Sequence, residues 1–339
     1  MGLIIENLHI QNFKSVRDVR LDCERINLFV GKPNAGKSNI LEAISLLGAG
    51  YSQGRFMEGF IRYKTLVQLF SNFNFREAIK VVTESKTAIL HANADTNDFE
   101  FALFENNPAP IPKTGPIRLS LESFGIFIEP NGIIRTPEDD RYLPTLVKKY
   151  NFAPLGDYQS NGLFLHPPHG DNFYMIARTH EALREEISQF LKPNGLEFLM
   201  DEETQRVSVV QKEGSTLLSF PLALVPDTFQ RYIFHLAAIL SNQNSALLFE
   251  EPETHSYAPY VYQLAQHILQ DAGNNQFFIT THNPYFLLPI LQETRDVAVF
   301  VTWLEDHQTR VRRLSEAEIR EVLDNGVDIF MNLDAFLPK

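Results

Sequence analysis

The sequence GKPNAGKS at residues 31–38 constrains this chain more than any other feature. It fits the pattern GxxxxGK[ST], in which glycines let backbone N–H groups curl around phosphates, the lysine (Lys37) neutralises their charge, and the serine (Ser38) can ligate magnesium. The apolar run RINLFV precedes it and the amphipathic run SNILEAISLLG follows it. A chance glycine-rich turn would not need this context, so a strand, a loop and a helix N-terminus together predict a phosphate-binding P-loop.

A second candidate is the segment ALLFEEPE at residues 246–253. Its apolar strand delivers Glu250 and Glu251 at the carboxyl end, where α/β sheets hold their ligands. One carboxylate can support magnesium while its neighbour orients and deprotonates water, which suits phosphoanhydride hydrolysis. Acidic pairs after strands are otherwise often solvated turns, and it is the P-loop that favours the catalytic interpretation.

A third polar cluster ends the apolar strand in FFITTHNP at residues 277–284. His282 lies at the same expected edge and could reach the terminal phosphate or the attacking water. The alternative is a histidine that only caps the helix after Pro284. Its spacing after the carboxylate strand favours a phosphate sensor.

The remaining pattern predicts how the chain is divided. LIIENLHI and RINLFV are expected as two strands at a sheet edge, and REAIKVVTESKTAILHAN with DFEFALFE as an antiparallel arm. From Phe229 onward, helices alternate with apolar strands, which indicates a mainly parallel sheet. Between them the Pro-rich NNPAPIPKTGP opens a mixed α/β insertion with one good helix, THEALREEISQFL. The predicted parts are an N-terminal lobe at 1–105, an inserted region at 106–220, a C-terminal lobe at 221–305 and a C-terminal extension at 306–339.

The order of P-loop, EEPE strand and TTH strand, with the opening IQNFKSV, resembles the ABC-type ATPases of the RecF, SMC and OLD class. These proteins act in DNA repair and phage defence, and the resemblance covers about residues 1–100 and 220–305. The stretches LFLHPPHGDNF and DTFQR also resemble a subgroup of AAA-family ATPases found beside defence nucleases and retrons. The resemblance implies an α/β P-loop NTPase with an ABC-type ATPase head.

The resemblance also implies ATP and Mg²⁺ as ligands and assigns roles to residues. Glu250 and Ser38 would hold Mg²⁺, Glu251 would be the general base, and His282 would be the switch histidine. The nucleotide phosphates would contact Gly31, Asn34, Gly36, Lys37, Ser38 and Asn39.

Members of this class bind ATP between two heads, where a Ser-Gly pair at the start of one helix touches the partner's nucleotide. Here that helix begins VPDTFQR at residues 225–231, with no Ser-Gly pair, and Thr228 is the candidate substitute. Lys14 and Ser15 would lie near the nucleotide. The departure predicts turnover that is slow or stimulated by a partner.

A homodimer or higher oligomer formed through the heads is therefore expected, whose nucleotide state controls a separate effector such as a nuclease or toxin. The alternative is an ATP-gated scaffold that hydrolyses ATP weakly or not at all and sequesters the effector. A transporter subunit would carry an LSGGQ-like signature, and a GTPase would carry NKxD; the chain has neither.

Composition limits the partners further. With 30 basic and 42 acidic residues, a net charge of −12 disfavours coating of nucleic acid, whereas the resemblance favours contact with it. Basic candidates are Lys148 with Lys149, and Arg310 with Arg312 and Arg313. The single cysteine, Cys23, indicates a reducing compartment, the cytoplasm, and no apolar run is long enough for a bilayer.

Three further clusters are weaker candidates. The prolines of HPPH at residues 166–169 argue against the helical face on which metal-ligand pairs usually lie. Asp201–Glu203 stands between two strand-like runs, where a charged hairpin turn is the ordinary explanation. Asp324, Asp328 and Asp334 are spread over too little chain to build the nuclease domain of OLD proteins.

Overall fold

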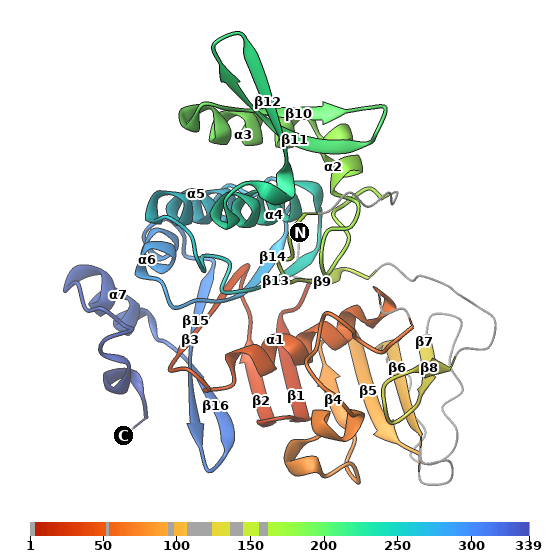
Figure 1. The fold of residues 1–339 in the computed structure, drawn as a ribbon. Coiled ribbons are helices and arrows are strands. Elements are labelled where there is room, and N and C mark those ends of the chain that lie inside the picture. The colour runs from red at the N-terminus through yellow and green to blue at the C-terminus, as the bar shows by residue number, and fades with distance from the viewer. Residues whose placement is uncertain are drawn as a thin grey trace.

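The computed structural model describes residues 4–51, 54–93, 98–106, 124–135, 145–155 and 162–338 (Figure 1). One of its two large sheets is antiparallel throughout, in the order β2-β1-β4-β5-β6-β7-β8. Its strands are β1 (Asn7–Phe13), β2 (Val16–Asp22), β4 (Ile79–Val82), β5 (Lys86–Ala92), β6 (Phe99–Glu105), β7 (Phe124–Ile128) and β8 (Ile134–Arg135). The predicted antiparallel arm is thus part of a larger lobe.

The other large sheet has the order β16-β15-β3-β14-β13-β9 and is parallel except for the β15–β16 pair. Its strands are β3 (Ile26–Gly31), β9 (Val147–Tyr150), β13 (Ala246–Glu250), β14 (Gln276–Thr280), β15 (Val297–Glu305) and β16 (Gln308–Arg313). Every residue of β3 and β14 is buried, which explains their unbroken apolar runs. The sequence prediction of a mainly parallel sheet is confirmed.

Helices separate and cover the sheets. Helix α1 (Lys37–Ser45) packs between them, contacting β1 on one side and β9, β13 and β14 on the other. The far face of the parallel sheet carries α4 (Asp227–Ser241), α5 (Ala258–Leu269) and α6 (Pro284–Glu293), and α7 (Glu316–Asp324) follows β16 (Figure 1). Alternation along the strands divides the core: Phe29 faces α1, whereas Leu28 and Val30 face the α4 layer.

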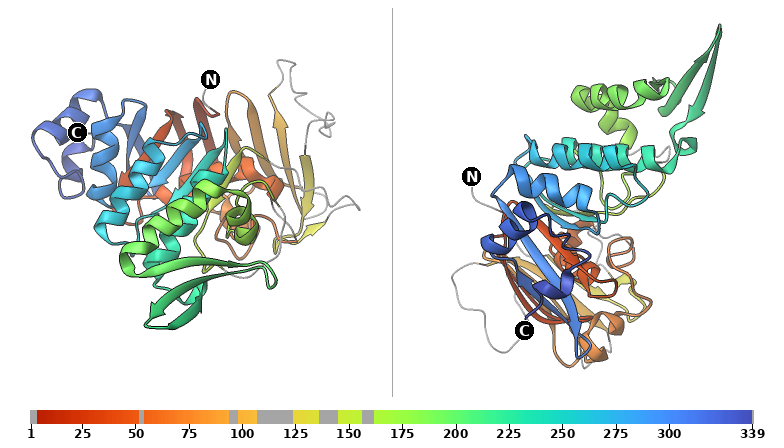
Figure 2. Two further views of the ribbon diagram at one scale, coloured as in Figure 1. Left: turned by 90° about the horizontal axis from the view of Figure 1, so that it is seen from above. Right: turned by 90° about the vertical axis from the view of Figure 1, so that its left-hand side faces the viewer.

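Above α4 lies a smaller unit, which we call the arm and which is distinct from the antiparallel arm predicted at residues 76–105. It contains α2 (Phe173–Thr179), α3 (Glu181–Leu191) and a three-stranded antiparallel sheet of β10 (Leu196–Asp201), β11 (Arg206–Glu213) and β12 (Thr216–Pro221). The β11–β12 hairpin projects from the molecule (Figure 2). Asp201–Glu203 begin the β10–β11 turn, as the sequence predicted, whereas α2 was not predicted.

The structure corrects the predicted order of the first strands. The polar stretch between the first two apolar runs is itself a strand, β2, in which Val16, Val19 and Leu21 are buried and the four other residues are charged and exposed. The second run is β3, which lies in the middle of the other sheet rather than at an edge. Strand pairing also crosses the predicted division at residue 105, since β7 and β8 continue the antiparallel sheet and β9 joins the parallel one. Most of the Pro-rich NNPAPIPKTGP lies outside the described residues.

Within the part of the chain that the structure describes, no helix combines the length and apolar character needed to cross a bilayer.

Candidate functional site

The three sequence motifs meet at one edge of the parallel sheet. Strand β14 lies between β3 and β13, and all three run in the same direction. The P-loop follows β3, Glu250 ends β13, and His282 follows β14 by two residues. The sheet order therefore brings together residues that are about 250 positions apart, at the edge where parallel sheets hold their ligands.

The P-loop contains two glycines, Gly31 and Gly36, that no other residue can replace without strain. Gly36 precedes α1 with φ of 93°, and a Cβ there would lie 1.8 Å from Thr309 Oγ1. A Cβ on Gly31 would lie 2.3 Å from the Thr302 carbonyl oxygen of β15. Asn34 also has a positive φ, 62°. The loop can therefore approach a phosphate with its backbone, as the motif requires.

Lys37 points back into its own loop. Its Nζ donates hydrogen bonds to the carbonyl oxygens of Gly31 at 2.8 Å and Lys32 at 3.0 Å. Burial lowers the pKa of Lys37, and the carboxylates of Glu251 and Glu250 oppose this shift. The ammonium is thus held at the mouth of the P-loop, near the carboxylates of Glu250, which ends β13, and of Glu251, which follows it.

Glu250 lies within a group of cations. Lys149 Nζ and an Arg62 nitrogen each lie 3.6 Å from its carboxylate. Burial by itself would raise the pKa of Glu250, but Lys149, the Ser38 hydroxyl and Arg62 together hold it below its usual range. The carboxylate is therefore ionised at neutral pH, beside the P-loop serine.

Glu250 and Ser38 are a suitable oxygen pair for Mg²⁺. Mg²⁺ usually takes one or two protein ligands and completes its shell with water and substrate phosphates. Among the described residues no three His, Cys, Asp or Glu side chains gather as a metal cage. An ionised carboxylate next to the serine hydroxyl of a phosphate loop fits a metal that arrives with its nucleotide.

Glu251 and His282 face each other across the strand ends. His282 Nε2 lies 3.3 Å from Glu251 Oε1, and both side chains are partly exposed. Burial lowers the pKa of His282, the Lys37 charge lowers it further, and Glu251 opposes both. A neutral imidazole beside a carboxylate can exchange a proton with water or accept a hydrogen bond from it.

A second network ties the first lobe to this site. Glu42, fully buried on α1, accepts hydrogen bonds from Lys14 Nζ and, at 2.7 Å, from Arg62 Nε. Lys14 also donates to the Arg62 carbonyl oxygen at 2.7 Å. Sequence reasoning named Lys14 near the nucleotide, missed Glu42 and Arg62, and assigned Lys149 to nucleic acid instead, because the partners of these residues lie far away in the chain. The one available signal was an acidic residue among the apolar positions of α1.

Ser15 and Asn39 form hydrogen bonds next to the P-loop. Asn39 Nδ2 donates to Ser15 Oγ at 2.7 Å, and Ser15 Oγ lies 2.7 Å from Thr309 Oγ1. These contacts fix the turn between β1 and β2 against the start of α1. Ser15 therefore lies beside the P-loop, with its hydroxyl shared between two neighbours.

Thr228 is separate from this group. It lies in the first turn of α4, where its hydroxyl donates to the His255 carbonyl oxygen at 2.6 Å. His255 itself lies 3.4 Å from Asp227. These contacts hold the start of α4 against the loop that follows Glu253.

The basic candidates do not form an open basic face. Lys148 and Lys149 are 4% and 2% exposed in β9, so the hypothesis that they contact nucleic acid is wrong. Arg310, Arg312 and Arg313 are ion-paired with Glu305, Glu318 and Glu24.

The structure also describes the surroundings of His169 and Cys23, which the sequence analysis singled out. His169 Nδ1 lies 2.9 Å from the Asn151 carbonyl oxygen. Burial raises the pKa of the Cys23 thiol to about 12, which keeps it protonated.

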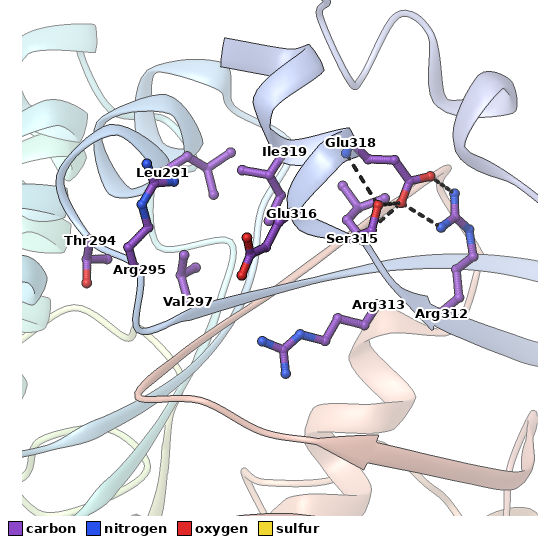
Figure 3. A pocket seen from close by; sticks show the side chains of 11 residues that line it. Leu291, Thr294, Arg295, Val297, Arg312, Arg313, Ser315, Glu316, Glu318 and Ile319 are labelled. Carbon is purple, nitrogen blue, oxygen red and sulfur yellow. Dashed lines mark hydrogen bonds and ion pairs between the residues drawn. The ribbon is translucent and has the colours of Figure 1, made fainter. Parts of the chain in front are cut away.

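A cavity of about 610 Å³ lies elsewhere, between the end of α6, β15, β16 and α7 (Figure 3). Figure 3 shows that Glu318 engages both Arg312 and Ser315 at its rim. None of its lining residues belongs to the predicted nucleotide site.

Comparison with known sequences places the chain in a family. Residues 26–288 match the family described as "AAA domain, putative AbiEii toxin, Type IV TA system". The DNA replication and repair protein RecF of Ruminiclostridium cellulolyticum is 33% identical over 123 residues, 34% of this chain and 29% of that protein. An uncharacterised protein of Methanocaldococcus jannaschii is 48% identical over 44 residues, 13% of this chain and 20% of that protein. The matches thus span less than a third of these relatives.

Comparison with solved structures gives the fold. An Smc head bound to the C-winged helix domain of ScpA has a TM-score of 0.52 at 14% identity, covering 93% of this chain and 99% of that one. An Smc head domain with an extended coiled coil, bound to the C-terminal domain of ScpA derived from Pyrococcus furiosus, has a TM-score of 0.52 at 12% identity, covering 95% and 98%. The chain belongs to the AAA-domain family named above and has the fold of an ABC-type ATPase head of the RecF and SMC class.

Proposed function

We propose that this chain binds ATP with Mg²⁺ at the edge formed by β3, β14 and β13 and hydrolyses it. The observation that carries this proposal is the convergence of Lys37, Glu251 and His282 from three parallel strands. These side chains supply a phosphate-binding cation, a base and a second proton carrier within one site.

Each residue has a defined part in the proposed reaction. When ATP binds, the Lys37 ammonium gives up its hydrogen bonds to two loop carbonyl oxygens and donates to oxygens of the β- and γ-phosphates instead. Glu251 takes the proton of the attacking water. His282, 3.3 Å from Glu251, positions that carboxylate relative to the terminal phosphate. Ser38 and Glu250 would hold Mg²⁺, which neutralises phosphate charge when bound.

We propose further that two heads close on ATP and that closure controls a separate effector in the cytoplasm. Thr228 at the positive end of α4 is the residue we expect to meet the nucleotide held by the second head. The family description names a toxin of a toxin–antitoxin system, RecF is named for DNA replication and repair, and the Smc heads are bound to ScpA. These names support an ATPase that acts with a partner, in DNA repair or on a toxin, whereas the proposed role in phage defence rests on the resemblance of the sequence motifs.

The test is ATP hydrolysis by the full chain with magnesium, alone and with DNA. Lys37→Ala should reduce ATP affinity by about 100-fold or more, because it removes the charge-assisted contacts to two phosphates. Lys32→Ala is the matched control, since Lys32 lies in the same loop but is exposed and pairs with Asp334 at 2.7 Å. Turnover equal to that of Lys37→Ala would reject hydrolysis.

Glu251→Gln separates binding from chemistry. It should keep ATP affinity and lower turnover by about 100-fold or more, because a general base typically contributes that much. Glu202→Gln, in the exposed β10–β11 turn, should change neither quantity. Normal turnover in Glu251→Gln would remove Glu251 from its role.

The alternative is a scaffold that holds ATP with little or no turnover. The absence of a Ser-Gly pair in residues 225–231 favours it. Two results together would select the scaffold. Lys37→Ala would lose ATP binding, and the turnover of the wild type, even with DNA, would be no higher than that of Glu251→Gln. Turnover above both variants would select the ATPase.

A further inference from the structure

Glu253 has no part in the chemistry proposed above. It lies in the turn after β13 and is 6% exposed. Its Oε1 accepts hydrogen bonds from the Thr281 hydroxyl at 2.6 Å and from the His282 backbone N–H at 3.0 Å. One carboxylate oxygen therefore joins the turn that carries Glu251 to the loop that carries His282.

The backbone makes a parallel connection. The N–H of Glu251 lies 3.1 Å from both the carbonyl oxygen and the hydroxyl oxygen of Thr280, the last residue of β14. Glu251 has φ of 45°, in the left-handed region that is unfavourable for a residue with a Cβ. Such a conformation persists only where the surrounding structure holds it. Contacts from residues 280–282 supply that support.

We propose that Glu253 is a positioning residue that fixes His282 opposite Glu251, and so sets the geometry of the base and the sensor. The inference rests on the proposed ATP hydrolysis for its functional meaning. Without the Glu253 carboxylate, the donors of residues 281 and 282 lose the one oxygen that accepts both of their hydrogen bonds, and the imidazole is no longer held 3.3 Å from Glu251.

The chemistry of Glu253 supplies a conservative replacement. Both donors converge on Oε1, whereas Oε2 is buried with no hydrogen-bond partner in the described structure. Burial raises the pKa of Glu253 to about 7, so the fold keeps an acid where ionisation is disfavoured. A glutamine oxygen at the position of Oε1 would accept the same two bonds. Positioning therefore requires the acceptor, and Glu253→Gln should retain it.

A readout that is independent of catalysis is the titration of His282, followed by NMR of its Cε1–H in the full chain without nucleotide. His282→Gln identifies the resonance. Lys37, Glu251 and the ring of Phe330 face the imidazole, and none of them is substituted in the variants. In Glu253→Ala the pKa of His282 should move toward its usual value as the side chain becomes more solvated, and in Glu253→Gln it should not move. An unchanged His282 titration in Glu253→Ala would overturn the proposal.

The kinetic readout is the split between turnover and ATP affinity. Glu253→Ala should lower kcat by about 10- to 100-fold, as expected when reacting groups are displaced by about 1 Å, with the Kd for ATP within about twofold of wild type. Glu253→Gln should restore most of kcat. Equal losses in both variants would overturn positioning through the acceptor.

Two controls keep the outcomes separate. If Glu253→Ala melts at a much lower temperature, Thr281→Val removes only one of the two donors and should shift the His282 titration in the same direction by a smaller amount; no shift would count against the proposal. If wild-type turnover does not exceed that of Lys37→Ala, hydrolysis is rejected, and the His282 titration still decides the role of Glu253.

Discussion

The nucleotide edge and the arm are built in opposite ways. At the edge, each important side chain has partners from distant parts of the chain: Glu42 binds Lys14 and Arg62, and Glu250 lies between Arg62 and Lys149. In the arm, all six residues of β12 are exposed, and its one described strand neighbour is β11. The edge is therefore held by many long-range contacts, and the outer arm by local pairing.

This difference indicates where the molecule can tolerate change. A residue with several buried polar partners cannot be removed without leaving one of them unpaired, whereas an exposed strand residue leaves only solvent behind. Substitutions should therefore be costly at the edge and nearly neutral in β12. Equal losses of stability in the two regions would contradict this difference between the edge and the arm.

The largest effect is expected for Glu42→Ala. Removing this fully buried carboxylate leaves Lys14 with an uncompensated charge in a largely buried position, and breaking a buried ion pair in this way costs about 3–5 kcal/mol. Denaturant unfolding would measure the loss. Glu105→Ala is the matched control, because its contact with Lys86 is exposed and 3.9 Å long; a similar cost for both would contradict the prediction.

The stability of the protein should depend on pH because of a buried histidine in α4, the helix beneath the arm. Burial lowers the pKa of His235 in α4 from 6.5 to about 4. The unfolded chain therefore binds a proton first, and stability is lost as pH falls from about 6.5 to about 4, by about 3 kcal/mol at 1.4 kcal/mol per unit. Unfolding free energies measured across this range should show the slope, and His235→Leu should reduce it. A slope unchanged in His235→Leu would assign it to other groups.

A matched pair of glycines sharpens the contrast between the edge and the arm. Gly36 and Gly214 both have positive φ, but a Cβ on Gly36 would meet Thr309 and Ser15, whereas nothing lies within 4 Å of one on Gly214. Gly36→Ala should cost about 2 kcal/mol more than Gly214→Ala, because the overpacking strain adds to the shared backbone strain. Thermal melts of the two variants would measure the difference. Equal shifts would mean that the P-loop adapts.

The smallest effect is expected in β12. Leu217 is 65% exposed, so Leu217→Ser should change the free energy of unfolding by less than about 0.5 kcal/mol. A loss of several kcal/mol would show that this strand is covered in solution, for instance by a second copy of the chain. Sedimentation at two concentrations would identify such a copy.

Much of the fold follows from the sequence because its core strands are continuous apolar runs. RINLFV, ALLFE and QFFIT become β3, β13 and β14, each followed by the polar residues that were expected. Strand β2 was misinterpreted because its outward residues are charged, and β9 because its two lysines look like a surface patch. In the structure Lys148 donates to Asn242 and Ser245, about 95 residues away. No local pattern shows such a partner.

The candidate site divides in the same way. Lys37, Glu250, Glu251 and His282 stand in motifs whose spacing is visible in the sequence, and the sheet order brings those motifs to one edge. Arg62, which contacts Glu250, has no motif of its own, and Glu253 stands in the EEPE segment without any local sign of its contacts with residues 281 and 282. Their roles depend on which loops become neighbours, and that is fixed only by the tertiary fold.

The position of β3 has a consequence for how the protein is made. Among the described strands, β3, complete by residue 31, pairs with β14 and β15 alone, which end at residues 280 and 305. On a ribosome its apolar residues must wait for most of the chain to be synthesised before either neighbour exists. Long-range pairing of this kind slows folding, so the nascent N-terminal segment depends on protection from aggregation until β14 and β15 emerge.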